Sequence, residues 1–400
     1  MANLTICLPT RNRQSYCIQT IQAIADCDTQ DFEVIVADNS DDGSVLRDFF
    51  SKTFSDPRFR LLAPQAEVLS MVDNWERTLA EAKGRWVSFI GDDDFIDPHV
   101  TSLIGRYERL HSEVDAIGWG RMSFNWPDNR PAPTLASIPT TFQTTIPVKS
   151  DLQNRLYRWS EGKRRPAAGF GIYHGAIKRS LMERIRRKYG GRHFEHPIVD
   201  YENSCKVIRE ARMLVHCQRP FSVLGACAAS NSAGTQSQTT MTARVATFKQ
   251  ETAKGVQMER PDFPFSRLEK GASITMSIAS TTWWFSKTYG IDLTGFPENF
   301  ARAAMHECRH LRSQEDYDLT VACFQAGFAE WDGGRWAGLF EPPPFGGIKS
   351  VNEISGVVMD TIYLSESKLK VRTPGEFYKF GEHAVAPVSN VVSGTRVFSR

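Results

Sequence analysis

Three consecutive aspartates, Asp92, Asp93 and Asp94, follow the apolar run WVSFI at residues 86–90. Carboxylates that lie side by side repel one another, so such a cluster calls for a positive partner. Hard oxygen ligands suit Mg²⁺ or Mn²⁺, and Mg²⁺ sites commonly combine one or two carboxylates with substrate phosphates. A metal held there would bridge a diphosphate and stabilise negative charge on a departing phosphate. The other interpretation of the cluster is a solvated turn or a helix cap.

Two further polar clusters also follow apolar runs: PTRNR at residues 9–13 and ADNSDD at residues 37–42. Ligands of an open parallel sheet bind beyond the carboxyl ends of its strands, so clusters placed there converge on one rim. Arg11 and Arg13 could contact phosphates or be ordinary surface arginines. Asp38 could bind a base or ribose, or cap the following helix. The joint placement of the clusters favours a binding site.

Strand and helix patterns alternate along the first 110 residues. Strands are expected at residues 4–8, 32–40, 59–63, 86–90 and 114–124, and helices around Ile18, Ile21 and Ile24 and at residues 43–54 and 70–82. This alternation predicts an α/β fold with a mostly parallel sheet flanked by helices. The sequence has neither GxGxxG after the first strand nor GxxxxGK[ST], which disfavours dinucleotide oxidoreductases and P-loop NTPases.

The pattern changes after this region. Residues 125–139 are rich in proline and polar residues and are expected to form a mobile connection near the site. Helices are expected near residues 151–160, 177–188 and 200–210. We expect three units, namely an α/β domain at residues 1–235 (halves 1–110 and 111–235), a mainly helical extension at 236–340, and a strand-rich appendage at 341–400 that begins at the breaker EPPPFGG.

The composition is that of an ordinary globular protein, with 400 residues, 41% apolar residues, 24% charged residues and a formal net charge of +2. The sequence shows no signal-peptide pattern and no apolar run of membrane-spanning length. Its eight cysteines are scattered without CxxC spacing, which fits the reducing cytoplasm better than a disulfide framework or a zinc site. We therefore expect a cytoplasmic protein.

Two basic clusters lie at residues 162–166 and 184–192. Each could be a solvated helix face or an attraction to an anionic membrane surface, so peripheral contact with the inner face of a membrane stays open. Nucleic acid is disfavoured as a partner because balancing acidic residues leave no extended basic stripe. Formation of a homo-oligomer is also left open.

Three motifs together resemble inverting family 2 glycosyltransferases of bacterial type, which have the GT-A fold. They are P-T-R-N-R, E-V-I-V-A-D-N-S-D-D-G and N-W-E-R-T-L-A-E-A-K-G-R-W-V-S-F-I-G-D-D-D, and they match that family in order and spacing. The match is firm over residues 1–110 and looser over residues 165–235. The resemblance implies a nucleotide-sugar donor and a Mn²⁺ or Mg²⁺ cofactor.

The resemblance also implies roles for individual residues. Asp93 would be the metal ligand, within a DxD-like position shared with Asp92, and Asp94 would help to orient the sugar. Many relatives carry an acidic residue where this chain has Ala37, which leaves the donor base open. The remaining residues implied on the donor side are Pro9, Thr10, Arg11, Arg13, Asp38, Asn74 and His174, the last of which could instead pack beneath a strand.

Transfer of a sugar with inversion needs a base that takes the proton of the acceptor hydroxyl. Asp200 lies at the start of a predicted helix, where a carboxylate is by default an N-cap. In the resembled family, an acidic residue that opens a helix here, with a basic residue about six positions later, is the catalytic base. Asp200 and Lys206 fit that pattern, with Glu202 as the first alternative and Glu195 as the second.

Residues 221–234 resemble the strand and loop that close over the donor in such enzymes. Ser230, Asn231 and Ser232 could touch phosphate there, or form a plain polar loop. The expected function is metal-dependent transfer of a sugar from a nucleotide-sugar donor to a hydroxyl of a glycan or lipid-linked acceptor, in bacterial surface polysaccharide synthesis. Alternatives are a nucleotidyltransferase and a non-catalytic glycan-binding scaffold on the same fold.

Overall fold

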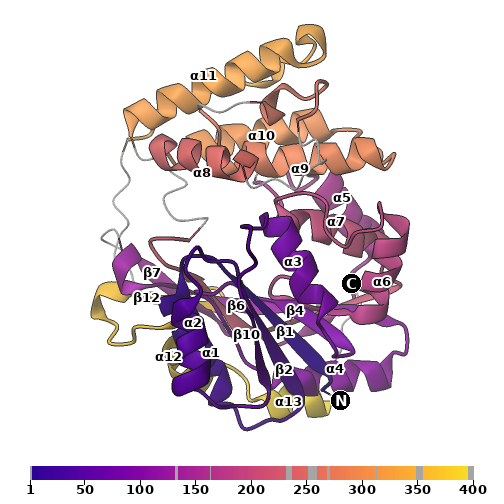
Figure 1. Cartoon of the computed structure of the whole chain (residues 1–400). Helices are drawn as coiled ribbons and strands as arrows, with labels where there is room; N and C mark the ends of the chain where they lie inside the picture. The colour runs from indigo at the N-terminus through magenta and orange to yellow at the C-terminus, as the bar shows by residue number, and fades with distance from the viewer. Residues whose placement is uncertain are drawn as a thin grey trace.

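The computed structural model describes residues 2–130, 134–162, 164–230, 237–250, 259–267, 271–311, 313–347 and 355–394. Figure 1 shows an α/β domain built on one sheet, with a layer of helices above it. The predicted α/β fold with helices flanking the sheet is therefore confirmed.

The N-terminal half of the sheet is parallel, with the strand order β4-β1-β2-β3. The strands are β1 (Leu4–Thr10), β2 (Phe32–Asp38), β3 (Phe59–Leu62) and β4 (Trp86–Phe89). Both faces of these strands are covered, which explains why their sequences are nearly continuous apolar runs. In β1, Ile6 and Leu8 point into one apolar core and Cys7 points into the other.

The flanking helices fill these two cores. The first core receives α1 (Gln14–Ala25), α2 (Ser44–Lys52) and α4 (Val100–Leu110). The second core receives α3 (Met71–Ala80), α5 (Lys149–Tyr157), α6 (Arg179–Lys188) and α7 (Val199–Glu210). The spacing of Ile21 and Ile24 predicts α1 correctly, since both side chains are fully buried. Ser70 caps α3 by accepting a hydrogen bond from the backbone of Asp73.

The second half of the sheet mixes strand directions. Its strands are β5 (Phe95–Ile96), β6 (Val114–Asn125), β7 (Leu135–Pro139), β8 (Thr144–Thr145), β9 (Gly175–Lys178) and β10 (Met213–Ala226). β6 and β10 form a long parallel pair, and β9 lies antiparallel between β4 and β6. The expected connection at 125–139 instead holds a 3-10 turn, η1 (Pro127–Asn129), and β7, because Ala136 and Ile138 alternate into the core.

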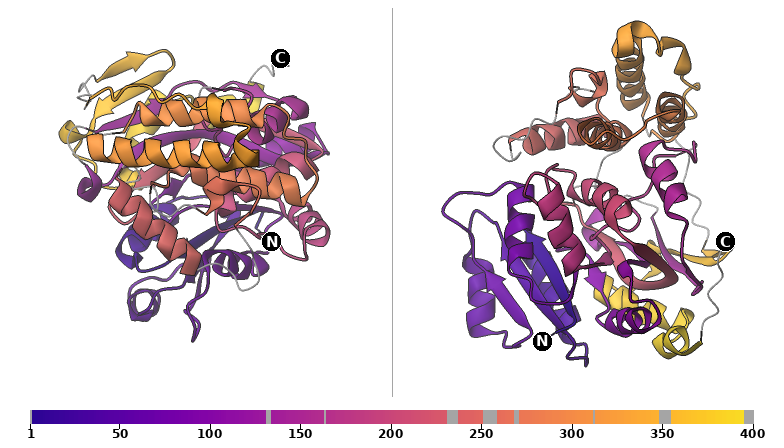
Figure 2. Two further views of the ribbon diagram at one scale, coloured as in Figure 1. Left: turned by 90° about the horizontal axis from the view of Figure 1, so that it is seen from above. Right: turned by 90° about the vertical axis from the view of Figure 1, so that its right-hand side faces the viewer.

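The C-terminal tail returns to the same domain. Its strands β11 (Gly356–Val358) and β12 (Thr361–Ser365) extend the sheet through an antiparallel pairing of β12 with β7. The helices α12 (Pro374–Gly381) and α13 (Val388–Gly394) follow, with the short turns η5 (Glu366–Lys368) and η6 (Glu382–Ala384). Phe377 and Val391 are fully buried in the first core, so the tail completes the α/β domain. The helices α12 and α13 lie on the side of the sheet opposite the upper helices, whereas β11 and β12 lie at the sheet edge (Figure 1 and Figure 2).

The described residues of the upper layer form mainly helices. It consists of α8 (Gln238–Gln250), α9 (Ile274–Thr288), α10 (Phe296–Cys308) and α11 (Gln314–Glu330), with short turns η2 (Pro264–Ser266), η3 (Trp331–Gly334) and η4 (Ala337–Leu339). A third core of aromatic side chains holds these helices together. In it Phe263 and Trp331 contact each other, and both contact Trp283 and Phe300. α9 also packs on α7, which ties this layer to the sheet domain.

Candidate active site

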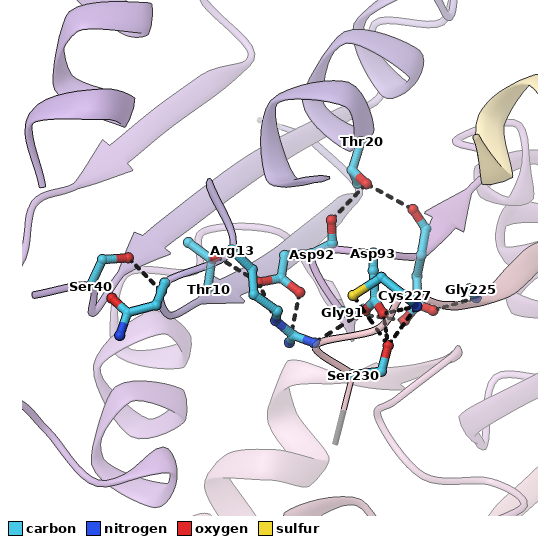
Figure 3. Close-up of polar contacts among 12 residues, drawn as sticks. Thr10, Arg13, Thr20, Ser40, Gly91, Asp92, Asp93, Gly225, Cys227 and Ser230 are labelled. Carbon is cyan, nitrogen blue, oxygen red and sulfur yellow. Dashed lines mark hydrogen bonds and ion pairs between the residues drawn. The ribbon is translucent and has the colours of Figure 1, made fainter. Parts of the chain in front are cut away.

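Three strands of the sheet end at one rim, and the polar clusters that follow them meet there. Thr10 ends β1 and pairs in register with Asp38, the last residue of β2. β4 lies on the other side of β1, and the turn after it carries Asp92, Asp93 and Asp94. Residues of all three clusters therefore lie at one rim of the sheet (Figure 3).

Asp92 is fully buried against the end of β1 and the start of α1. Its Oδ2 atom accepts hydrogen bonds from Thr10 Oγ1 at 2.6 Å and from Arg13 Nε at 3.1 Å. Its Oδ1 atom accepts no hydrogen bond from the described residues, but lies 2.7 Å from Arg13 Nη2, which neutralises it. The residue that immediately precedes α1 thus supplies the cation for this carboxylate.

Asp93 faces the opposite wall of the site, which is formed by the end of β10. Its Oδ2 atom accepts hydrogen bonds from the backbone N–H of Cys227, at 3.2 Å, and from the hydroxyl of Ser230. Its Oδ1 atom lies 3.7 Å from Arg13 Nη1. Figure 3 shows Arg13 reaching between the carboxylates of Asp92 and Asp93. One oxygen of Asp93 is thus anchored, and the other faces a cation.

Asp94 turns into the interior. Its Oδ2 atom lies 2.6 Å from the hydroxyl of Tyr173 and 3.0 Å from His174 Nε2. The backbone N–H groups of Gly91 and Gly225 donate to the same carboxylate over 2.7 and 2.8 Å. With this many donors, Asp94 fastens the turn to β10 and to the segment before β9. His174 is buried behind Asp94, and its Nδ1 atom lies 2.9 Å from the hydroxyl of Ser222.

The electrostatics differ along the run of aspartates. Burial raises the pKa of Asp92 to about 7, with a smaller contribution from Asp93 and with Arg13 opposing. Burial and the neighbouring Asp94 likewise raise the pKa of Asp93. Burial acts the same way on Asp94, but His174, Tyr173 and the Gly225 N–H together lower its pKa. Asp94 is therefore the stable anion, and the other two carboxylates need a cation to stay charged.

The residues present fit a divalent metal. Asp92 Oδ1 and Asp93 Oδ1 are hard oxygens that lie 2.7 and 3.7 Å from the Arg13 guanidinium, and the first has no hydrogen-bond partner within the described residues. Mg²⁺ and Mn²⁺ favour such carboxylate oxygens, completed by water and phosphate. Arg13 satisfies the same charge requirement, so a metal bound to these oxygens would compete with the guanidinium for them.

The other expected donor-side residues line the rim or support it. Asp38 accepts a hydrogen bond from the Ser40 N–H at 2.9 Å through Oδ1, while its buried Oδ2 has no partner within the described residues. Pro9 lies within β1, beside Thr10. Arg11 pairs with Asp41 at 3.7 Å, on the exposed edge of the rim.

Asn74 supports the end of β2 from α3. Its amide nitrogen donates to the Ala37 carbonyl at 3.3 Å, and its amide oxygen accepts from Arg77 at 2.7 Å. Arg77 in turn donates to the carbonyl of Asp38. Asn74 therefore holds the strand that presents Asp38.

Asp200 is the second residue of α7 and is partly exposed. Burial raises the pKa of its carboxyl group, although the backbone N–H groups of Tyr201 and Asp200 itself and the charge of Arg121 lower it. Tyr173 connects this region to the aspartates. Burial first, and then the charges of Asp94, Asp93 and Asp200, raise the pKa of Tyr173. Asp200 therefore lies near enough to the aspartate cluster for the charges of both to act on the Tyr173 hydroxyl.

The alternative bases are engaged elsewhere. Glu202 is fully buried and forms an ion pair with Lys206, whose Nζ also lies 2.8 Å from Glu195 Oε2. Tyr289 donates its hydroxyl to Glu195. The expected pattern of Asp200 with a later basic residue is present in the sequence, but Lys206 pairs with these two glutamates.

Some contacts of the site were not expected from the sequence, and Gly225 is the clearest. A Cβ atom at this position would lie 1.7 Å from the Asp93 backbone oxygen, so only glycine allows β10 to approach the aspartates. A glycine inside a strand is the signal that could have indicated such an approach. Tyr173 and Cys227 carried no comparable signal. Asn231 and Ser232 lie outside the described residues, whereas Ser230 contacts Asp93.

In the parts of the chain that the structure describes, no helix has the length and apolar character to span a bilayer.

A family model described as Glycosyl transferase family 2 matches residues 5–170. A sequence search of curated proteins found no match.

Solved structures with a similar arrangement include two glycosyltransferases. S. aureus TarS 1-349 in complex with UDP-GlcNAc is 14% identical, over 82% of this chain and 87% of that chain, with a TM-score of 0.41. The mannosyltransferase PcManGT from Pyrobaculum calidifontis, in complex with GDP-Man and Mn²⁺, is 16% identical, over 84% of this chain and 83% of that chain, with a TM-score of 0.38. Likeness at this level is too distant to transfer a substrate or a residue's role.

Proposed function

We propose that the protein is a metal-dependent, inverting glycosyltransferase, because the family model described as Glycosyl transferase family 2 matches residues 5–170. It moves a sugar from a nucleotide-sugar donor to a hydroxyl of a glycan or lipid-linked acceptor. The observation that carries this proposal is the pairing of the buried carboxylates of Asp92 and Asp93 with Arg13, at the carboxyl ends of β1 and β4.

The donor side follows from that cluster. Asp93, with one carboxylate oxygen anchored by Cys227 and Ser230, is the residue that would hold Mn²⁺ or Mg²⁺. The bound metal supplies positive charge that neutralises the diphosphate as it departs. Arg13 would then shift from the carboxylates to a phosphate, since guanidinium groups bind both. Asp38 has a buried oxygen without a partner in the described residues, which suits a hydroxyl or N–H donor of ribose or base.

The acceptor side depends on Asp200. Its carboxyl group takes the proton as the acceptor hydroxyl attacks the anomeric carbon, while the bond from that carbon to the diphosphate oxygen breaks. Attack opposite the leaving group inverts the anomeric carbon. Burial raises the pKa of Asp200, which makes the carboxylate a stronger base than an exposed aspartate. Glu202 and Glu195 are less suited to this role because both are engaged in ion pairs with Lys206.

The biological setting rests on the family resemblance alone. We propose a role in bacterial surface polysaccharide synthesis, with the protein in the cytoplasm and its acceptor a glycan or a lipid-linked glycan. Contact with the inner membrane face and formation of a homo-oligomer stay predictions.

Binding of the donor is the first test. UDP-, GDP-, CMP- and dTDP-sugars are added to the full chain with and without Mn²⁺, and thermal unfolding is followed. A ligand at a hundredfold excess over its Kd stabilises the native state by about 2.7 kcal/mol. One nucleotide sugar is expected to raise the melting temperature only when Mn²⁺ is present, and Asp93→Asn is expected to abolish the shift.

The control is Asp41→Asn, which removes an exposed carboxylate from the same rim and is expected to keep the shift. A shift that survives in Asp93→Asn would contradict the assigned metal ligand. Product analysis addresses the rivals, because a glycosyltransferase releases a nucleoside phosphate, whereas a nucleotidyltransferase releases pyrophosphate. A scaffold protein would release neither.

A further inference from the structure

A second cluster of metal-binding side chains lies away from the aspartates. Cys27 follows α1, Asp97 follows β5, and His99 immediately precedes α4. Their Sγ, carboxylate and ring-nitrogen atoms all lie within 4.8 Å of one another. Neither their positions in the sequence nor the proposed transfer reaction accounts for this grouping. We propose that Cys27, Asp97 and His99 form a zinc-binding site.

The distances suit tetrahedral zinc. Cys27 Sγ lies 3.5 Å from His99 Nδ1. Zn–S and Zn–N bonds of about 2.3 and 2.0 Å, set at a tetrahedral angle, separate sulfur from nitrogen by about 3.5 Å. Asp97 Oδ1 lies 2.8 Å from the same nitrogen, at hydrogen-bond distance. That oxygen has to recede by about half an ångström when the metal replaces the shared proton. The three residues supply S, N and O ligands, a set that zinc accepts.

The surroundings hold the ligands in place. Asp28 Oδ1 lies 2.9 Å from His99 Nε2, so this carboxylate can accept the Nε2–H and leave the Nδ1 lone pair for a metal. Tyr378 donates its hydroxyl to Asp97 Oδ2 at 2.8 Å, away from the shared atom. Arg58 donates to the carbonyl oxygen of Cys27 at 2.7 Å and fixes the turn that carries the thiol.

The site is also accessible. Seven of the eight cysteines are buried, and Cys27 is the exception. The side chain of His99 is 43% exposed, which lets the ring adjust and leaves room for water as the fourth ligand. Zinc bound here would join the turn between α1 and β2 to the turn between β5 and α4, three residues beyond Asp94. The site would thus brace the segment that carries the aspartates.

Titration of the full chain with Co²⁺ tests this proposal. Excess Mg²⁺ is added to occupy oxygen-ligand sites, and the near-ultraviolet charge-transfer band of a cobalt–thiolate bond is recorded. We expect one equivalent of Co²⁺ to produce the band and Zn²⁺ to displace it. Cys27→Ser is expected to abolish the band, and His99→Gln to weaken Co²⁺ binding at least tenfold.

The matched control is Cys227→Ser, which removes the cysteine beside Asp93 and is expected to leave the band and the affinity unchanged. A full chain without the band would overturn the proposal, and so would a band that persists in Cys27→Ser. Unchanged Co²⁺ affinity in His99→Gln, whose exposed side chain tolerates substitution, would overturn it as well.

Discussion

Arg13→Gln removes the positive charge that lies between Asp92 and Asp93, while glutamine keeps a polar side chain of similar length. Asp92 is fully buried and the Arg13 side chain is 18% exposed, so water compensates this loss poorly. Breaking a buried ion pair by removing one partner costs about 3–5 kcal/mol, because the remaining charge is left uncompensated. We expect a loss of unfolding free energy in this range at pH 8. At lower pH Asp92 takes up a proton more readily, which relieves its repulsion with Asp93 and reduces the loss.

The control is Arg11→Gln on the same rim. The Arg11 side chain is 33% exposed and Asp41 is 64% exposed, with 3.7 Å between the paired atoms. Exposed pairs of this kind contribute about 0–1 kcal/mol. Urea and thermal unfolding of the wild type and both variants give the comparison. Equal losses for the two variants would refute the reasoning.

The Mn²⁺ affinity of Arg13→Gln gives a second test of the same reasoning. The metal and the Arg13 guanidinium compete for the oxygens of Asp92 and Asp93, so the variant should bind Mn²⁺ more tightly than the wild type in the absence of donor. Electron paramagnetic resonance of free Mn²⁺ measures this affinity directly. Addition of Mn²⁺ is expected to restore part of the lost stability in Arg13→Gln. Weaker Mn²⁺ binding in the variant would show that Arg13 assists the metal rather than competing with it.

Three further predictions concern single residues. Asp200→Asn should lower kcat by about 10²- to 10⁴-fold, with donor affinity unchanged in the thermal-shift assay; activity within tenfold of the wild type would exclude it as the base. Gly225→Ala should lower the melting temperature and metal affinity together, because the added Cβ atom meets the Asp93 backbone oxygen at 1.7 Å. Lys206→Met should cost about 3–5 kcal/mol, since it leaves Glu202 buried without a partner. Burial raises the pKa of Glu202 from 4.5 to about 7 even against Lys206, so this group stabilises the fold below pH 4.5 and loses that effect as the pH rises through 7. Urea unfolding from pH 5 to pH 9 should show a steeper decline in Lys206→Met than in the wild type.

The N-terminal half of the fold was predictable because its signals are local. Continuous apolar runs such as Val34, Ile35 and Val36 mark strands that are buried on both faces, and the polar residues after them mark the rim. The spacing of Ile18, Ile21 and Ile24 likewise predicts the helix α1. Each of these patterns is read within a few residues, and the parallel register then brings the clusters together.

The remaining features depend on contacts between distant parts of the chain. Gly225 donates to Asp94 from 131 residues away, and no local pattern links the two positions. The strand β7 lies in a proline-rich segment whose composition favours a loop, and its pairing with β12 overrides that preference. Lys206 has the spacing expected of a partner for the base, yet the helical i to i+4 relation places it on Glu202.

The long-range contacts of the aspartate turn have a consequence for the order of folding. Asp94 is held by Gly225, and Asp97 by Tyr378, which lies 281 residues further along the chain. During synthesis the first four strands can pair early, but these carboxylates acquire their last partners only when α12 has left the ribosome. Contacts of such high sequence separation form slowly, because the loop-closure entropy precedes the gain. The final hydrogen bonds of the aspartate turn therefore form late in the folding of each newly synthesised chain.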